Sequence, residues 1–120
     1  MRTSLTFVLL AFCLPVLPGC PTGQFPAELG ECPDGSTVTW ADASAVLEAN
    51  CTRCHSSTLT GADRQAAPEN WDYDTRDGAL RDPDEVWLRV YTDNMPNDAV
   101  FAPEADKGVL WEWYSCDGPE

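Results

Sequence analysis

The chain of 120 residues has a single histidine, two methionines and only seven lysine and arginine side chains. One histidine leaves no acid–base pair and no nucleophile triad to assemble, so we expect no catalyst. The seven basic residues stand against twenty acidic ones, and the formal charge of −13 would repel the phosphates of a nucleic acid. The longest apolar run is also far shorter than the roughly 20 residues that a membrane-spanning helix needs.

That apolar run, Leu5–Leu14, follows a positive residue near the N-terminus, as in a secretory signal peptide. We predict that the signal peptide comprises residues 1–19. Its end, with Leu17 at −3 and Gly19 at −1, resembles the lipobox of bacterial lipoproteins and implies a lipid on Cys20. Signal cleavage without lipidation is the alternative. The expected location is exported, lipid-anchored and facing the periplasm, and the resemblance favours the outer membrane over the inner one.

The residues Cys51-Thr52-Arg53-Cys54-His55 form a complete C-x-x-C-H motif. In an exported protein this spacing indicates covalent attachment of haem c through both thiols, with the histidine as an axial iron ligand. A zinc site would need four ligands, and the chain has no second pair with suitable spacing. A thioredoxin-like dithiol would need a βαβ framework, of which there is no sign. We therefore predict one covalent haem.

Met95 is the predicted second axial ligand of the iron. It is the one methionine besides the initiator, and it lies 40 residues after His55 in the polar turn Asn94-Met95-Pro96, a poor place for a core side chain. A soft thioether ligand favours ferrous iron. Two strong axial ligands would leave no open position for a substrate.

Two of the six cysteines remain once the others have predicted roles. Of the six cysteines, Cys13 leaves with the signal peptide, one takes the lipid and two take the haem. Cys32 and Cys116 remain, and in an oxidising compartment these two should form a disulfide. We expect that bond to stabilise the fold by about 4–5 kcal/mol in the chain-entropy description.

Residues 20–35 are predicted to be a lipidated cysteine followed by a tether, with Pro21–Leu29 lacking any periodic apolar pattern. Residues 36–118 form the predicted folded domain. Within it, residues 56–81 are rich in Gly, Pro, Asp and Thr, and a connection of that length is expected to wrap a cofactor.

Capping signals at Thr39, Asp82 and Pro103 predict three helices, the second ending near Thr92 and the third before Gly118. Gly in the middle of the third helix would cost about 1 kcal/mol relative to Ala, which a close helix–helix approach would explain. The predicted apolar faces are Trp40, Ala43, Leu47 and Cys51 on the first helix, Val86, Trp87, Val90 and Tyr91 on the second, and Val109, Leu110, Trp113 and Tyr114 on the third.

Together, the C-x-x-C-H motif, Met95-Pro96 and the closing aromatic segment Trp111-Glu112-Trp113 resemble the small class I-type cytochrome c domain over residues 36–118. The resemblance implies an all-α fold of about three main helices around one haem. It also implies that the first and last helices cross, which would bring Cys32 and Cys116 close together.

The same resemblance implies a haem environment. A proline carbonyl, here assigned to Pro68, would accept the ring N–H of the axial histidine, and Arg64, Trp71 and Tyr73 would contact the propionates. Four further tryptophans are expected to pack around the haem: Trp40, Trp87, Trp111 and Trp113.

The function implied is electron transfer between redox partner proteins. Without the signal peptide the chain has 6 basic and 20 acidic residues, since Arg2 is lost from the seven, so a partner with a basic patch would be attracted. Two alternatives stay open at this point. One is a haem sensor or ligand-binding module in which a small ligand displaces Met95. The other is a haem relay subunit of a larger redox complex.

Overall fold

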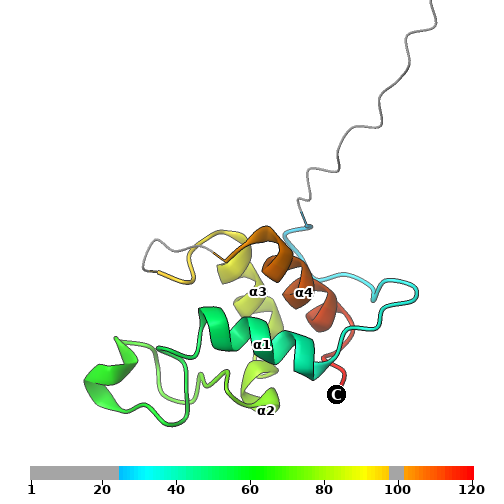
Figure 1. Ribbon diagram of the computed structural model, residues 1–120. Helices are drawn as coiled ribbons and strands as arrows, with labels where there is room; N and C mark the ends of the chain where they lie inside the picture. Colours follow the sequence, from blue (N-terminus) through cyan, green and yellow to red (C-terminus); the bar gives the residue numbers. More distant parts are fainter. Residues whose placement is uncertain (1–24, 98–101) are drawn as a thin grey trace, which may run out of the picture.

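The computed structural model describes residues 25–97 and 102–120, and every regular element within them is a helix (Figure 1). The order is α1 (Trp40–Asn50), the 3₁₀ helix η1 (Gly61–Arg64), α2 (Arg76–Ala79), α3 (Pro83–Tyr91) and α4 (Glu104–Ser115). The predicted all-α class is confirmed for these residues. None of their helices is long and apolar enough to cross a membrane. The predicted signal peptide and Cys20 lie outside the described residues.

The first two main helices begin where their capping residues predicted. The hydroxyl and the backbone N–H of Thr39 donate to the Asp42 carboxylate at 2.8 and 2.9 Å, and these two hydrogen bonds lower the pKa of Asp42. At the start of α3, the Asp82 carboxylate accepts from the backbone N–H of Glu85 at 3.2 Å, with Pro83 as the first helical residue. Local sequence therefore fixes both helix starts.

The last helix also has its predicted limits. Pro103 directly precedes α4, which ends at Ser115. Beyond it, Gly118 has a φ of +60°, and its N–H donates to the Trp113 carbonyl at 2.9 Å. A left-handed backbone conformation just after the end of a helix favours glycine at that position.

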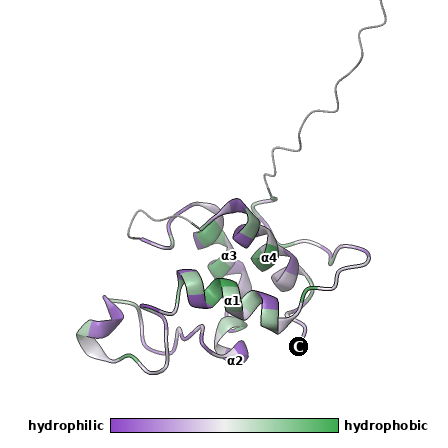
Figure 2. Cartoon of the chain, viewed as in Figure 1, coloured by the Kyte–Doolittle hydropathy of each residue, from purple (hydrophilic) through white to green (hydrophobic). Residues whose placement is uncertain are grey.

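The core lies where α4 packs against both α1 and α3. The predicted contact of the first and last helices is present, with the rings of Trp40 and Trp113 at 5.4 Å between centroids. Figure 2 shows the most hydrophobic residues on these three helices. The largest fully buried side chains are Trp87, Trp113, Leu47 and Leu110.

The connection over residues 56–81 contains two one-turn helices, η1 and α2, that its composition did not predict. The start of α2 is capped locally, since the Thr75 hydroxyl accepts from the Gly78 N–H at 3.1 Å. Its end is held from a distance, because the Tyr114 hydroxyl donates to the Ala79 carbonyl at 3.2 Å. Elements this short depend on such tertiary contacts.

An N-terminal strap (residues 25–31) packs across α3 and α4. The ring of Phe25 lies edge-on to Trp87, with 6.3 Å between centroids, and stacks on Trp111 at 6.0 Å. The indole N–H of Trp87 donates to the Pro26 carbonyl at 3.0 Å. The strap is therefore part of the folded body.

This packing corrects two expectations. The predicted tether Pro21–Leu29 can only be the part before Phe25, which lies outside the described residues. Gly108 accommodates the ring of Phe25 and not a neighbouring helix: a Cβ added there would lie 2.8 Å from Cζ of the ring. The strap ends at a disulfide between Cys32 and Cys116, with 4.4 Å between the Cα atoms.

Candidate functional site

The C-x-x-C-H motif forms the turn that ends α1. The N–H of Cys51 donates to the Leu47 carbonyl at 2.7 Å, as the last helical hydrogen bond. The N–H groups of Cys54 and His55 then both donate to the Cys51 carbonyl, at 3.1 and 3.0 Å. Both thiols are outside any disulfide and partly buried. One continuous turn thus carries all three side chains.

These three side chains line one cavity of about 260 Å³ together with Met95. The lining also includes Val86 and Val90, which lie one turn apart on α3. Trp71 and Tyr73, from the connection before α2, add aromatic rings to the lining. The sequence predicted Val86 and Val90 as core residues, but did not predict that they face a cavity.

The His55 imidazole is held in one orientation. Its Nδ1 lies 2.9 Å from the Trp71 carbonyl oxygen, and because a carbonyl only accepts, Nδ1 carries the proton. The ring stacks on Tyr73 with 4.7 Å between centroids. Burial lowers the pKa of His55, which favours the neutral ring, although the Trp71 hydrogen bond acts in the opposite direction. In that neutral tautomer, Nε2 keeps its lone pair for a metal.

The acceptor of the imidazole proton was predicted wrongly. The Pro68 carbonyl accepts instead from the Arg64 guanidinium, at 2.7 Å from Nη2. The Trp71 carbonyl, three residues later along the chain, takes the predicted role. Pro68 still lines the cavity.

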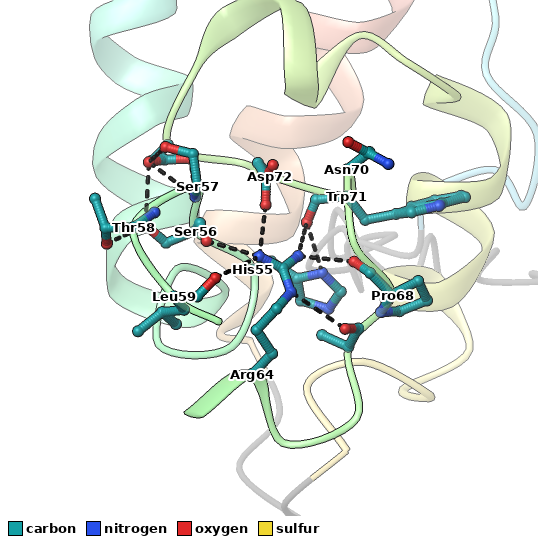
Figure 3. Close-up of polar contacts among 12 residues, drawn as sticks. His55, Ser56, Ser57, Thr58, Leu59, Arg64, Pro68, Asn70, Trp71 and Asp72 are labelled. Carbon is teal, nitrogen blue, oxygen red and sulfur yellow. Dashed lines mark hydrogen bonds and ion pairs between the residues drawn. The ribbon is translucent and has the colours of Figure 1, made fainter. Parts of the chain in front are cut away.

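Arg64 is not among the residues that line the cavity, so its predicted contact with a propionate stays a prediction that the lining does not support. Its side chain is 5% exposed and forms an ion pair with Asp72 at 2.8 Å. Each guanidinium nitrogen donates to the connection around it (Figure 3). The acceptor carbonyls are those of Ser56, Leu59, Ala67, Pro68 and Trp71. This buried cation organises the loop beside His55.

Met95 reaches the cavity from the turn after α3. Its N–H and that of Asn94 both donate to the Arg89 carbonyl, at 3.0 and 2.9 Å. Lys107 on α4 holds the same turn, since its ammonium lies 2.8 Å from the Asp93 carboxylate. Lys107 is 7% exposed and was not predicted to be buried. The structure therefore brings Met95 and His55 to one cavity from different elements.

The surroundings of the Cys51 thiol disfavour its thiolate form. Burial raises the pKa of Cys51 to about 12, so the sulfur stays protonated near neutral pH. Among the described residues, no group of three or more His, Cys, Asp or Glu side chains is placed to hold a metal ion. A site built only from such ligands is thus not formed there.

The tryptophans divide between the cavity and the core. Trp71 lines the cavity as predicted, whereas the four assigned to packing around the haem are absent from its lining: Trp40, Trp87, Trp111 and Trp113. These four pack against the strap and against the helices around α4. The prediction was wrong because an aromatic residue on an apolar face is equally suited to a helix interface.

Polar side chains at the cavity were missed by sequence reasoning. Arg53 and Arg89 both line it, with Glu85 forming an ion pair to Arg89 at 2.7 Å. Arg53 occupies a variable position of the motif, and Arg89 follows Glu85 by one turn, so both resemble ordinary exposed residues in the sequence. The acidic chain thus has two arginines at this cavity.

Comparisons with protein families, with curated proteins and with solved structures find no match to this chain.

Proposed function

We propose that the chain is a monohaem c-type cytochrome that carries single electrons between redox partner proteins. One observation carries the proposal: two thiols, an imidazole and the one thioether of the described residues line the same cavity. Cys51 and Cys54 would hold the haem covalently, and His55 and Met95 would be the axial ligands. This assigns the chain as an electron carrier and not an enzyme.

The residues fit haem c in three respects. Val86 and Val90 of α3, together with Trp71, give the cavity an apolar wall, as a porphyrin face requires. His55 carries its proton on Nδ1, which leaves Nε2 free for iron. Arg53 and Arg89 are the arginines that line the cavity, so they replace Arg64 as the proposed partners of the propionates.

The chemistry that haem c supplies when bound is the gain and loss of one electron at iron. The chain's part is to hold the two iron ligands in fixed positions. The Trp71 carbonyl and the Tyr73 ring fix the imidazole, and the Arg89 carbonyl with the Lys107–Asp93 ion pair fixes the turn of the methionine. A fixed ligand set changes little between oxidation states, which favours rapid electron transfer.

The proposed cellular setting rests on the sequence. Signal cleavage and a lipid on Cys20 would anchor the domain at the periplasmic side of a membrane, with the outer membrane favoured. The acidic chain would dock transiently on partners with basic patches. No described observation favours the sensor or the relay subunit over the carrier.

Covalent attachment is tested by haem staining after denaturing electrophoresis of the exported protein. We expect wild type to stain and a C51A/C54A variant not to stain. The matched control, C32S/C116S, also removes two cysteines and should stain as wild type does. Staining of C51A/C54A, or loss of haem from denatured wild type, would refute the attachment.

The axial methionine is tested in the same stained protein. Met95→Ala should keep the covalent haem but lose the weak far-red absorption of ferric iron bound to thioether, and its reduction potential should fall. An unchanged spectrum would eliminate Met95 as ligand. Reduced wild type should be unaltered under carbon monoxide, and rapid binding of that gas would support the ligand-binding alternative instead.

A further inference from the structure

The buried guanidinium of Arg64 lies beside the axial imidazole without touching the cavity. We propose that Arg64 is a positioning residue that raises the electron affinity of the iron site, acting on His55 through the carbonyl of Trp71. This inference rests on the proposed function, because it assigns a regulatory role at the same site.

The geometry centres on a shared acceptor. The Trp71 carbonyl oxygen lies 2.9 Å from His55 Nδ1 and 3.5 Å from Arg64 Nη2. Arg64 Nη1 also donates to the carbonyl of Ser56, the residue after His55, at 2.8 Å. Figure 3 shows the guanidinium next to the imidazole, reaching both of these carbonyls. Arg64 therefore holds the backbone on both sides of the ring.

A cation at this position favours reduction of the iron in two ways. First, it draws electron density from the Trp71 carbonyl, which weakens the hydrogen bond from His55 and makes the imidazole a poorer electron donor. Second, its own charge favours the iron state with one more electron, and screening is weak because the side chain is 5% exposed. Both effects stabilise reduced iron.

Asp72 opposes Arg64 at the same place. Its carboxylate lies 2.8 Å from Arg64 Nη1, and its side chain is 22% exposed, so water screens it more than it screens the guanidinium. Neutralising Arg64 and neutralising Asp72 therefore change the charge beside the His55–Trp71 hydrogen bond in opposite directions.

A purely structural role for Arg64 makes a different prediction. If the guanidinium only holds the loop in place, Arg64→Gln weakens its contacts and Asp72→Asn weakens them slightly, so any change in potential has the same direction in both variants. If its charge acts on the imidazole, the two variants change the potential in opposite directions. Asp72→Asn keeps an oxygen to accept from Nη1, so it removes charge with little loss of structure.

The experiment is a redox titration of the haem-loaded, full-length protein and its variants. We expect Arg64→Gln to lower the ratio of reduced to oxidised protein at fixed ambient potential by about tenfold, and Asp72→Asn to raise it. A tenfold change equals about 59 mV for a one-electron couple. Arg76→Gln is the matched control, since Arg76 also binds a carbonyl, that of Gly118 at 2.8 Å, yet does not line the cavity.

A second readout reports the hydrogen bond directly. In the reduced protein, the Nδ1 proton resonance of His55 should move downfield in Arg64→Gln, because the carbonyl then accepts from the imidazole more strongly. It should move upfield in Asp72→Asn. Urea unfolding of each variant measures structural damage separately from these shifts.

The outcomes separate the inference from the proposed function. The inference is supported if the reduction potential changes in opposite directions in Arg64→Gln and Asp72→Asn and stays unchanged in the Arg76→Gln control. Changes of the potential in the same direction, or no change, overturn the inference. The cytochrome proposal still stands in that case if covalent haem and the far-red absorption are present. Absence of covalent haem refutes the proposed function itself. Should Arg64→Gln fail to fold, Asp72→Asn alone decides, because an unchanged or lower potential in that variant contradicts the inference.

Discussion

Gly108 provides a quantitative test of how the strap packs on α4. A Cβ at this position would lie 2.8 Å from Cζ of Phe25, whereas carbon atoms in contact are normally about 3.5–4.0 Å apart. In Gly108→Ala the ring must therefore move by roughly 1 Å, and overpacking of this kind costs about 1–3 kcal/mol. Alanine also stabilises the helix by about 1 kcal/mol over glycine. The net loss of unfolding free energy should be about 0–2 kcal/mol.

Removal of the ring should reverse the sign. In a Phe25→Ala background the new methyl group meets no ring, so Gly108→Ala should stabilise the protein by about 1 kcal/mol. The double-mutant cycle then gives a coupling energy of about 1–3 kcal/mol between the two positions. Urea unfolding of the four haem-loaded proteins, followed by circular dichroism, measures each free energy.

The control is Ala105→Gly, an exposed position in the first turn of the same helix. It should have the same effect with and without Phe25, because it changes helix propensity only. Equal stabilisation by Gly108→Ala in both backgrounds would show that the Phe25 ring does not lie against Gly108. The strap would then not be packed as described.

Two further predictions concern the other restraints of the fold. The C32S/C116S variant opens a loop with a sequence separation of 84 and should lose about 4–5 kcal/mol of unfolding free energy in urea. A loss below about 1 kcal/mol would contradict the loop-closure argument. Lys107→Met removes the buried ammonium from Asp93, so the methionine turn should open more easily. Imidazole should then bind the oxidised haem about tenfold more tightly in a spectroscopic titration, which corresponds to about 1.4 kcal/mol. Unaltered imidazole affinity would show that the ion pair does not restrain the turn.

The sequence predicted those parts of the fold that depend on local chemistry. Thr39 and Asp82 mark two helix starts because their capping contacts lie within three or four residues. The C-x-x-C-H turn and Met95 stood out by residue type, and the structure brings their side chains to one cavity. That they hold a haem stays a prediction.

The remaining features depend on contacts across the chain. Arg64 is an ordinary polar residue in the sequence, and only the folded loop gives it six acceptor groups and excludes it from the cavity. The strap was taken for a tether because residues 25–31 have no periodic pattern. Phe25 finds its partners, Trp87 and Trp111, more than 60 residues away. No local rule could pair them.

The strap also limits how far the domain can lie from a membrane. With a lipid on Cys20, as proposed, only five backbone steps separate the anchored residue from Phe25, which is fixed on the body. Fully extended, five steps span at most about 18 Å. A partner protein would have to meet the domain within a thin layer above the bilayer, so the reach of the partner's own docking surface would limit which proteins can bind.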